Sequence, residues 1–126
     1  MTLEVIKLSD IEGDIFPAGR HSRVLVGKGG LQAENFVTGH SNIFVGGKIP
    51  LHSHKNEEVY IILSGKGEMT VGNETKVVEG VSAVYIPSNV EHSLTNIGEE
   101  NMEIIYIYSP AGIVDHWEQE RLGKLK

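Results

Sequence analysis

The sequence contains no cysteine, little positive charge and no long apolar run. Without cysteine, disulfides, thiolate metal sites and thiol nucleophiles are excluded. With 11 Lys and Arg against 17 Asp and Glu, the formal charge is −6, so we expect no nucleic-acid partner. No stretch approaches the roughly 18 consecutive apolar residues of a membrane span. The first residues, MTLEVIKLSD, lack the apolar core of a signal peptide. We therefore expect a cytoplasmic protein with no membrane partner.

Short runs rich in Val, Ile, Thr and Tyr are abundant instead. They are separated by Gly, Asn, Pro and Ser, and they read RVLVG, ENFVTGHSNIFV, EVYIIL, GEMTVG, TKVVEG, SAVYIP, HSLTNI and MEIIYIYS. This pattern predicts an all-β antiparallel sandwich or barrel. With 126 residues, the chain is long enough for one domain with its own core. We expect a core over residues 22–110, an N-terminal arm over 1–21 and a C-terminal tail over 111–126.

The punctuation between these runs adds two local predictions. Gly72-Asn73 stands between two runs and predicts a two-residue hairpin turn. The tail, GIVDHWEQERLGK, is the one segment with helical character, with Asp115 as a candidate N-cap and Gly123 as its end. Trp117 in this tail is expected to be a packing anchor. We expect His21 and His116 to be surface or interface residues.

Two histidines stand one residue apart in the stretch GGKIPLHSHKNEEVYIILSG. On a strand, residues i and i+2 face the same side, so His52 and His54 would present their imidazoles together. Glu58 opens the next run and could add a carboxylate. Imidazoles with a carboxylate suit iron, manganese, cobalt, nickel, copper or zinc. From this stretch alone, two unrelated histidines on an exposed strand edge explain the pattern equally well.

A second stretch, EGVSAVYIPSNVEHSLTN, places His92 just after a proline-containing turn. Asn89 in that turn tolerates the left-handed conformation that a tight turn needs. A lone histidine at such a place is usually surface. It gains meaning only if the fold returns it to the first pair.

The two stretches together resemble the paired motifs of the cupin superfamily. The first motif is glycine, five residues, His-x-His, three or four residues, Glu, six residues, glycine. Every spacing is met here, by Gly46, His52, His54, Glu58 and Gly65.

The second motif is glycine, five residues, Pro-x-Gly, two residues, His, three residues, Asn. It is matched by Gly80, Pro87, His92 and Asn96, with two departures. Six residues, not five, separate Gly80 from Pro87, for which we expect a bulge near residues 81–82. Asn89 replaces the motif's second glycine. Neither departure affects a predicted ligand.

The resemblance implies a small cupin-type antiparallel β-barrel of the jelly-roll kind. His52, His54, Glu58 and His92 would converge in it on one divalent transition metal, of which Fe, Mn, Ni, Co, Cu and Zn all remain open. A six-coordinate ion would keep two positions for ligands, whereas a structural zinc site would be closed by four ligands. The superfamily hosts dioxygenases, isomerases, decarboxylases, lyases and non-enzymatic binders, so the fold does not decide the reaction.

Three further residues are candidates for catalysis. His40 lies in a strand run and could act as an acid, a base or a substrate contact, although an ordinary strand histidine is the commoner case. Tyr60 shares strand parity with Glu58, and the resemblance favours the Tyr106 face toward the metal. Buried tyrosines of this kind are more often core residues with a satisfied hydroxyl.

The chain is therefore expected to be a metal-binding cupin, with two alternatives for its role. One is a metal-dependent enzyme acting on a small oxygenated molecule, and the other is a non-enzymatic module that binds a sugar or organic acid. The run MEIIYIYS is apolar on both faces, so Ile105 and Ile107 need a cover. We expect a homodimer across this outer face, with the run RHSRVLVG as a strand added or exchanged. Coverage by the tail with Trp117 is the competing explanation.

Overall fold

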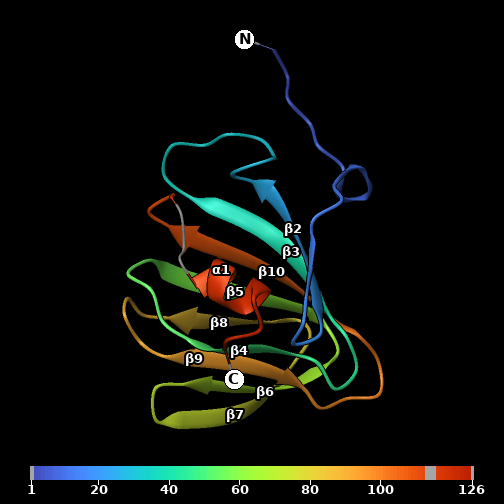
Figure 1. The fold of residues 1–126 in the computed structure, drawn as a ribbon, viewed down its shortest axis with the longest axis vertical. Helices are drawn as coiled ribbons and strands as arrows, with labels where there is room; N and C mark the ends of the chain where they lie inside the picture. Colours follow the sequence, from blue (N-terminus) through green and yellow to red (C-terminus); the bar gives the residue numbers. More distant parts are fainter. Residues whose placement is uncertain (1, 113–115, 126) are drawn as a thin grey trace.

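The computed structural model describes residues 2–112 and 116–125. These residues form two antiparallel β-sheets, a 3-10 turn and one short helix (Figure 1). One sheet has six strands in the order β1-β2-β3-β10-β5-β8, and the other has four in the order β4-β9-β6-β7. The elements are η1 (Leu8–Asp10), β1 (Asp14–Phe16), β2 (Arg20–Val26), β3 (Val37–Ile43), β4 (Lys48–His52), β5 (Glu57–Ser64), β6 (Lys66–Val71), β7 (Glu74–Glu79), β8 (Ser82–Ile86), β9 (His92–Asn96), β10 (Met102–Ser109) and α1 (His116–Arg121).

The hydrophobic core lies between the two sheets. Both sheets contribute buried side chains to it, among them Ile43, Ile62, Ile86, Met102 and Ile104 from the larger sheet and Ile49, Met69 and Leu94 from the smaller. The predicted all-β antiparallel class is confirmed. The barrel is not closed by hydrogen bonds, however, because over residues 2–112 and 116–125 no strand of one sheet pairs with a strand of the other.

The two faces of β10 behave as its alternation predicts. Ile104, Tyr106 and Tyr108 are buried, while Ile105 is half-buried and Ile107 is 37% exposed. The RHSRVLVG run forms β2, which pairs with β1 on one side and β3 on the other. Within the chain β1 pairs only with residues 20–22 of β2, and the expectation that this run is a strand added or exchanged across an interface stays a prediction. The sheet also begins at β1, earlier than the expected core at residue 22.

Turn chemistry explains the connections near the motifs. Gly72 has φ 60° and opens the two-residue turn between β6 and β7, as predicted. Asn89 has φ 63°, so it adopts the left-handed conformation in place of the motif's glycine. The first residues of the longer spacing, Gly80 and Val81, form the connection between β7 and β8. The pairing of β8 with β5 is regular, so the predicted bulge is absent from this described pair.

Asn96 ties the ends of two strands from different sheets. Its side-chain Nδ2 donates to the backbone carbonyls of Ile43 (3.0 Å), Phe44 (3.2 Å) and Glu100 (2.8 Å), and its Oδ1 accepts from the Gly98 N–H (2.9 Å). Asn96 is the last residue of β9, and Ile43 is the last residue of β3. The buried amide therefore fastens the two sheets together at one end of the core.

The predicted C-terminal helix is confirmed as α1. Gly123, at φ 72°, ends it and donates its N–H to the Glu120 carbonyl (2.9 Å). The Trp117 ring lies 6.0 Å from Tyr106 and 6.1 Å from Tyr108, centroid to centroid, so α1 is anchored against the inner face of β10. The candidate cap Asp115 lies outside the described residues. None of the helices that the structure describes has the length and apolar character to cross a membrane.

Candidate metal centre

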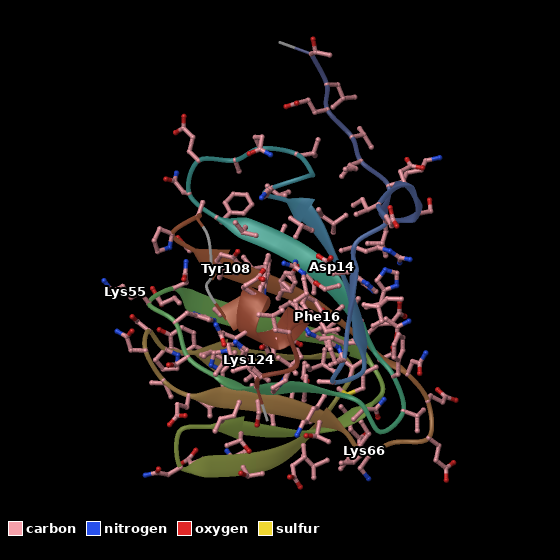
Figure 2. All side chains as sticks on the ribbon, in the orientation of Figure 1. Asp14, Phe16, Lys55, Lys66, Tyr108 and Lys124 are labelled. Carbon is pink, nitrogen blue, oxygen red and sulfur yellow. The ribbon has the colours of Figure 1, made fainter. Side chains whose placement is uncertain are left out.

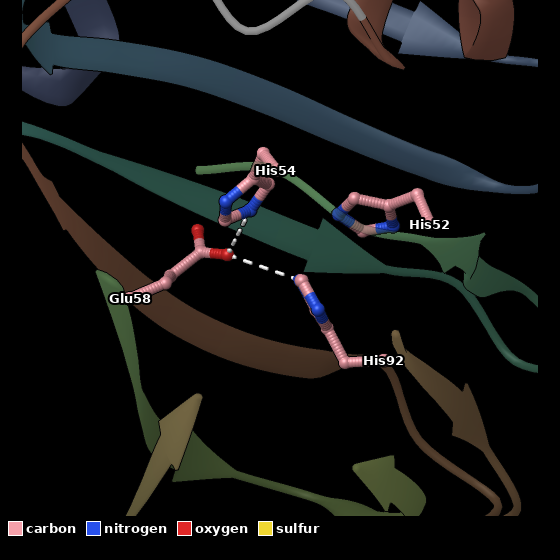
Figure 3. A group of neighbouring side chains, drawn as sticks. All are labelled: His52, His54, Glu58 and His92. Atoms are coloured by element: carbon pink, nitrogen blue, oxygen red, sulfur yellow. Dashed lines mark hydrogen bonds and ion pairs between the residues drawn. The ribbon is translucent and has the colours of Figure 1, made fainter. Parts of the chain in front are cut away.

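Four side chains, three from the two sheets and one from the loop after β4, converge beside the core (Figure 3). His52 ends β4 and pairs in register with His92, which begins β9, while Glu58 lies near the start of β5 in the facing sheet. One ligand atom from each of these residues and from His54 lies within 4.8 Å of the others. The structure thus brings together all four residues predicted as metal ligands.

His54 reaches the cluster by a different route from the one predicted. β4 ends at His52, so His54 belongs to the following loop and the two-residue strand repeat does not place it. Its Nδ1–H instead donates to the backbone carbonyl of Asn56 (3.0 Å), and the Asn56 side chain donates to the Pro110 carbonyl (2.6 Å). A hydrogen-bonded loop therefore orients this imidazole.

The three imidazoles share one hydrogen-bonding pattern. Each places Nδ1 against a backbone carbonyl two residues away, which can only accept, so Nδ1 carries the proton and Nε2 is the nitrogen that a metal ion would take. The pairs are His52 with Pro50 (2.6 Å), His54 with Asn56 (3.0 Å) and His92 with Val90 (2.9 Å). With Nδ1 held as a donor to the backbone, Nε2 is the nitrogen left for a cation, which would take the place of any proton that Nε2 shares with Glu58.

Glu58 supplies the negative charge of the cluster. Its Oε1 lies 3.0 Å from Nε2 of His54 and 3.2 Å from Nε2 of His92 (Figure 3). Burial alone would raise the pKa of Glu58, but the hydrogen bonds from His54 and His92 outweigh it and lower the pKa. For His54, burial favours a lower pKa, yet the hydrogen bond and charge of Glu58 raise it. The Glu58 carboxylate is thus ionised at neutral pH, and a cation beside it would stabilise this buried negative charge.

His52 has the opposite character. Burial, with the neighbouring His92 as the next cause, lowers the pKa of His52 to about 3. Its imidazole is therefore neutral at physiological pH and ready to bind a cation. Three oriented imidazoles and one ionised carboxylate within a few ångströms fit a divalent transition metal. The exposed neighbour Glu57 instead accepts a hydrogen bond from Tyr85 (2.6 Å), as expected if Glu58 is the carboxylate of the site.

Tyr60 and Tyr106 both line the cavity beside the cluster. The Tyr60 ring is 6.0 Å from His92, and the Tyr106 hydroxyl lies 3.1 Å from the Ser22 hydroxyl. Burial raises the pKa of Tyr60 well above its usual value and that of Tyr106 to about 12. Both phenols keep their protons at neutral pH, so they can donate hydrogen bonds to a ligand but do not act as bases.

The structure does not bring His40, the third catalytic candidate, to the site. On β3 it pairs in register with Ile105, which faces outward, and its Nε2 lies 3.1 Å from Oε1 of Glu103. The inner face of β3 carries Gly39 and Ser41 instead, because a Cβ at Gly39 would collide with the Tyr106 hydroxyl. His40 therefore lies on the opposite face of the sheet from the cluster.

Three residues beside the cluster were not among the predicted site residues. Arg20 lines the same cavity, and Glu120 of α1 binds it through two hydrogen bonds. The Tyr108 ring lies 6.2 Å from His54, and its hydroxyl donates to the Gly112 carbonyl (3.3 Å). Tyr108 shares β10 parity with Tyr106, which was a usable signal. No local pattern connects Arg20 with a partner 100 positions away.

Residues 39–108 match the model of the cupin domain family, and the chain belongs to that family. An uncharacterized protein of Methanocaldococcus jannaschii is 42% identical over 62 residues, which are 48% of this chain and 50% of that protein. The chain spans about half the length of the curated relatives it matches.

Two solved structures show how far the fold likeness extends. A predicted oxalate decarboxylase from Thermotoga maritima has a TM-score of 0.76 at 18% identity, covering 85% of this chain and 99% of that one. The polyketide cyclase RemF from Streptomyces resistomycificus has a TM-score of 0.74 at 15% identity, covering 98% and 99%. At these identities the likeness shows the cupin fold alone.

Proposed function

We propose that the protein is a metal-dependent enzyme that acts on a small oxygenated molecule in the cavity beside His52, His54, Glu58 and His92. The observation that carries this proposal is the orientation of three imidazoles by backbone carbonyls around an ionised, buried carboxylate. A structural zinc site is typically closed by four ligands in a tetrahedron. A metal bound by these four side chains with higher coordination would supply a Lewis acid with positions left for a ligand's oxygens.

The chain's own residues would position that ligand. Tyr60 and Tyr106 hold protonated hydroxyls beside the cluster, so they can donate hydrogen bonds to oxygen atoms. Ile49 adds an apolar wall to the same cavity. Two structural neighbours carry enzyme names, a decarboxylase and a cyclase, so the fold is compatible with catalysis.

A second candidate function is non-enzymatic binding of a sugar or organic acid. One observation favours it: apart from the cluster itself, the described cavity offers no group suited to act as a base. His40 faces the other side of the sheet, and both cavity tyrosines have raised pKa values. Under this alternative a ligand would bind to the metal-loaded cavity and leave unchanged.

Metal analysis followed by an activity panel tests the proposal. Protein purified without chelator is analysed for its metal, and oxygen uptake and product formation are followed with small diketones, phenols and organic acids. We expect about one metal per chain and turnover that disappears in the His52→Ala/His54→Ala variant. A bound metal with saturable ligand binding but no turnover would establish the binding module. Full metal occupancy in the double variant would place the site elsewhere.

A further inference from the structure

The cavity beside the metal cluster is too small for any organic ligand while α1 is docked. Its volume is about 10 Å³, which is room for about one water molecule. The residues that line it are Arg20, Ile49, His52, Glu58, Tyr60, Tyr106 and Trp117. A ligand that approaches the cluster through this cavity must therefore displace part of its wall.

Arg20 is a buried cation in that wall. Its Nε and Nη2 donate to the two carboxylate oxygens of Glu120, at 2.8 and 2.7 Å, and its Nη1 donates to the Ser41 hydroxyl at 2.7 Å. The side chains of Arg20 and Glu120 are only 3% and 1% exposed. The two parallel hydrogen bonds are the fork geometry with which arginine recognises carboxylate ligands.

The pair is a poor choice if its role is only to hold α1. Burying both charges carries a desolvation cost that can exceed the gain from their attraction, and apolar residues of similar volume often stabilise a fold equally well. The cation also shares its cavity with His52 and Glu58 of the cluster. An arginine in this position makes chemical sense as an anion receptor that Glu120 occupies.

Trp117 separates this inner cavity from a much larger space. An open groove of about 890 Å³ lies on its other side, between α1 and the loop that follows β2, and Trp117 lines both. Two further contacts hold α1: Trp117 packs against Tyr106 and Tyr108, and Arg121 makes an exposed ion pair with Asp14 (3.1 Å), beside Phe16 (Asp14 and Phe16 are labelled in Figure 2). Displacing α1 would join the groove to the cluster.

We propose that Arg20 recognises the carboxylate of a small acidic ligand, and that α1 is a plug whose Glu120 takes the ligand's place until the ligand displaces it. The inference rests on the proposed function in assigning the neighbouring cluster as the reaction centre. Capture of the carboxylate by Arg20 needs no metal, so it can be tested separately.

The single tryptophan of the chain, Trp117, reports the position of the plug. Malonate is titrated into metal-free protein while Trp117 emission is followed, with neutral malonamide as the matched control ligand. We expect malonate to shift the emission to the red and malonamide to leave it unchanged. The variant Glu120→Gln should respond at a malonate concentration at least about tenfold lower, because its docked state competes less. Glu118→Gln, on the exposed face of the same helix, should behave as wild type.

The double variant Arg20→Gln/Glu120→Gln removes both charges and leaves neither buried ion unpaired. We expect its plug to be loosened and its response to malonate and malonamide to be equally weak. An equal response of the wild type to both ligands would overturn the proposal, as would no difference between Glu120→Gln and Glu118→Gln. Preference for malonate in the double variant would place carboxylate recognition elsewhere. Failure to bind metal would instead refute the proposed function and leave these results standing.

Discussion

Metal affinity should fall as the pH is lowered, but less steeply than three ligand histidines suggest. A metal ion binds neutral imidazole, so every protonated ligand histidine must first lose its proton. Each such proton changes the affinity about tenfold per pH unit, so three would give about a thousandfold. His52 does not contribute, because burial lowers its pKa from 6.5 to about 3. Above about pH 4, at most two protons compete with the metal ion for the histidine nitrogens. The metal affinity should therefore change by no more than about a hundredfold per pH unit.

The onset of this decline should lie above the pKa of free histidine. Glu58 raises the pKa of His54 above that of a free histidine, which is about 6.5. This imidazole therefore keeps its proton to a higher pH than an isolated one. The variant Glu58→Gln removes that charge and should move the onset down, although it also removes a ligand and weakens binding throughout. Glu57→Gln, at the exposed neighbouring position, serves as the matched control and should leave the onset unchanged.

Competition with a chromophoric chelator between about pH 5 and pH 8 measures the slope. Calorimetry in buffers of different protonation enthalpy counts the protons released on binding. Release of three protons near the acid end would show that His52 is protonated in the metal-free protein. In that case burial does not keep this imidazole neutral, and the reasoning from its surroundings fails.

Three further predictions concern the ligand set, the plug and the assembly. His92→Ala should lose the metal while the fold survives, because strand pairing and core burial do not depend on the ion; metal analysis with circular dichroism checks both. In a double-mutant cycle, Arg20→Gln and Glu120→Gln should couple by more than about 1 kcal/mol in the free energy of unfolding, since each alone leaves a buried partner unpaired. We also predict a homodimer across the outer face of β10, which Ile105→Lys/Ile107→Lys should convert to a monomer in sedimentation.

Controls for these predictions lie in the same elements. The exposed pair Arg121 and Glu118 should couple by less than about 1 kcal/mol in a parallel cycle. Equal coupling in the two cycles would mean that the buried pair gains nothing from its surroundings. A wild-type monomer at micromolar concentration would remove the dimer, and unaltered metal content in His92→Ala would remove this histidine from the ligand set.

The ligand cluster could be predicted from the sequence because motif spacing carries it. His52 and Glu58 are close in the chain. The match to the second motif predicted that His92, on the distant strand β9, joins them. The route of His54 was not predictable, since the strand repeat stops at His52 and loop hydrogen bonds place the next imidazole. The strand β4 was not predicted, because Gly46, Gly47 and Pro50 interrupt the strand pattern.

The error at His40 has a steric cause. Strand alternation places Thr38, His40 and Asn42 on one face of β3 but does not say which face is inside. The inner face holds the small residues, because Tyr106 and Arg20 from neighbouring strands fill the space above Gly39 and Ser41. Packing between elements, rather than the pattern within one, decided the orientation.

Asn96 shows that the letters of a motif report two separate kinds of information. The histidines and the glutamate of the motifs are the candidate metal ligands, whereas this asparagine holds the backbone in place. Its amide makes hydrogen bonds to three backbone carbonyls and one backbone N–H. A chain that kept Asn96 and the turn residues but lost His52 and His92 would retain the recognisable signature with no capacity for metal. A match to the family therefore indicates the fold, and metal binding must be inferred from whether each ligand residue is present.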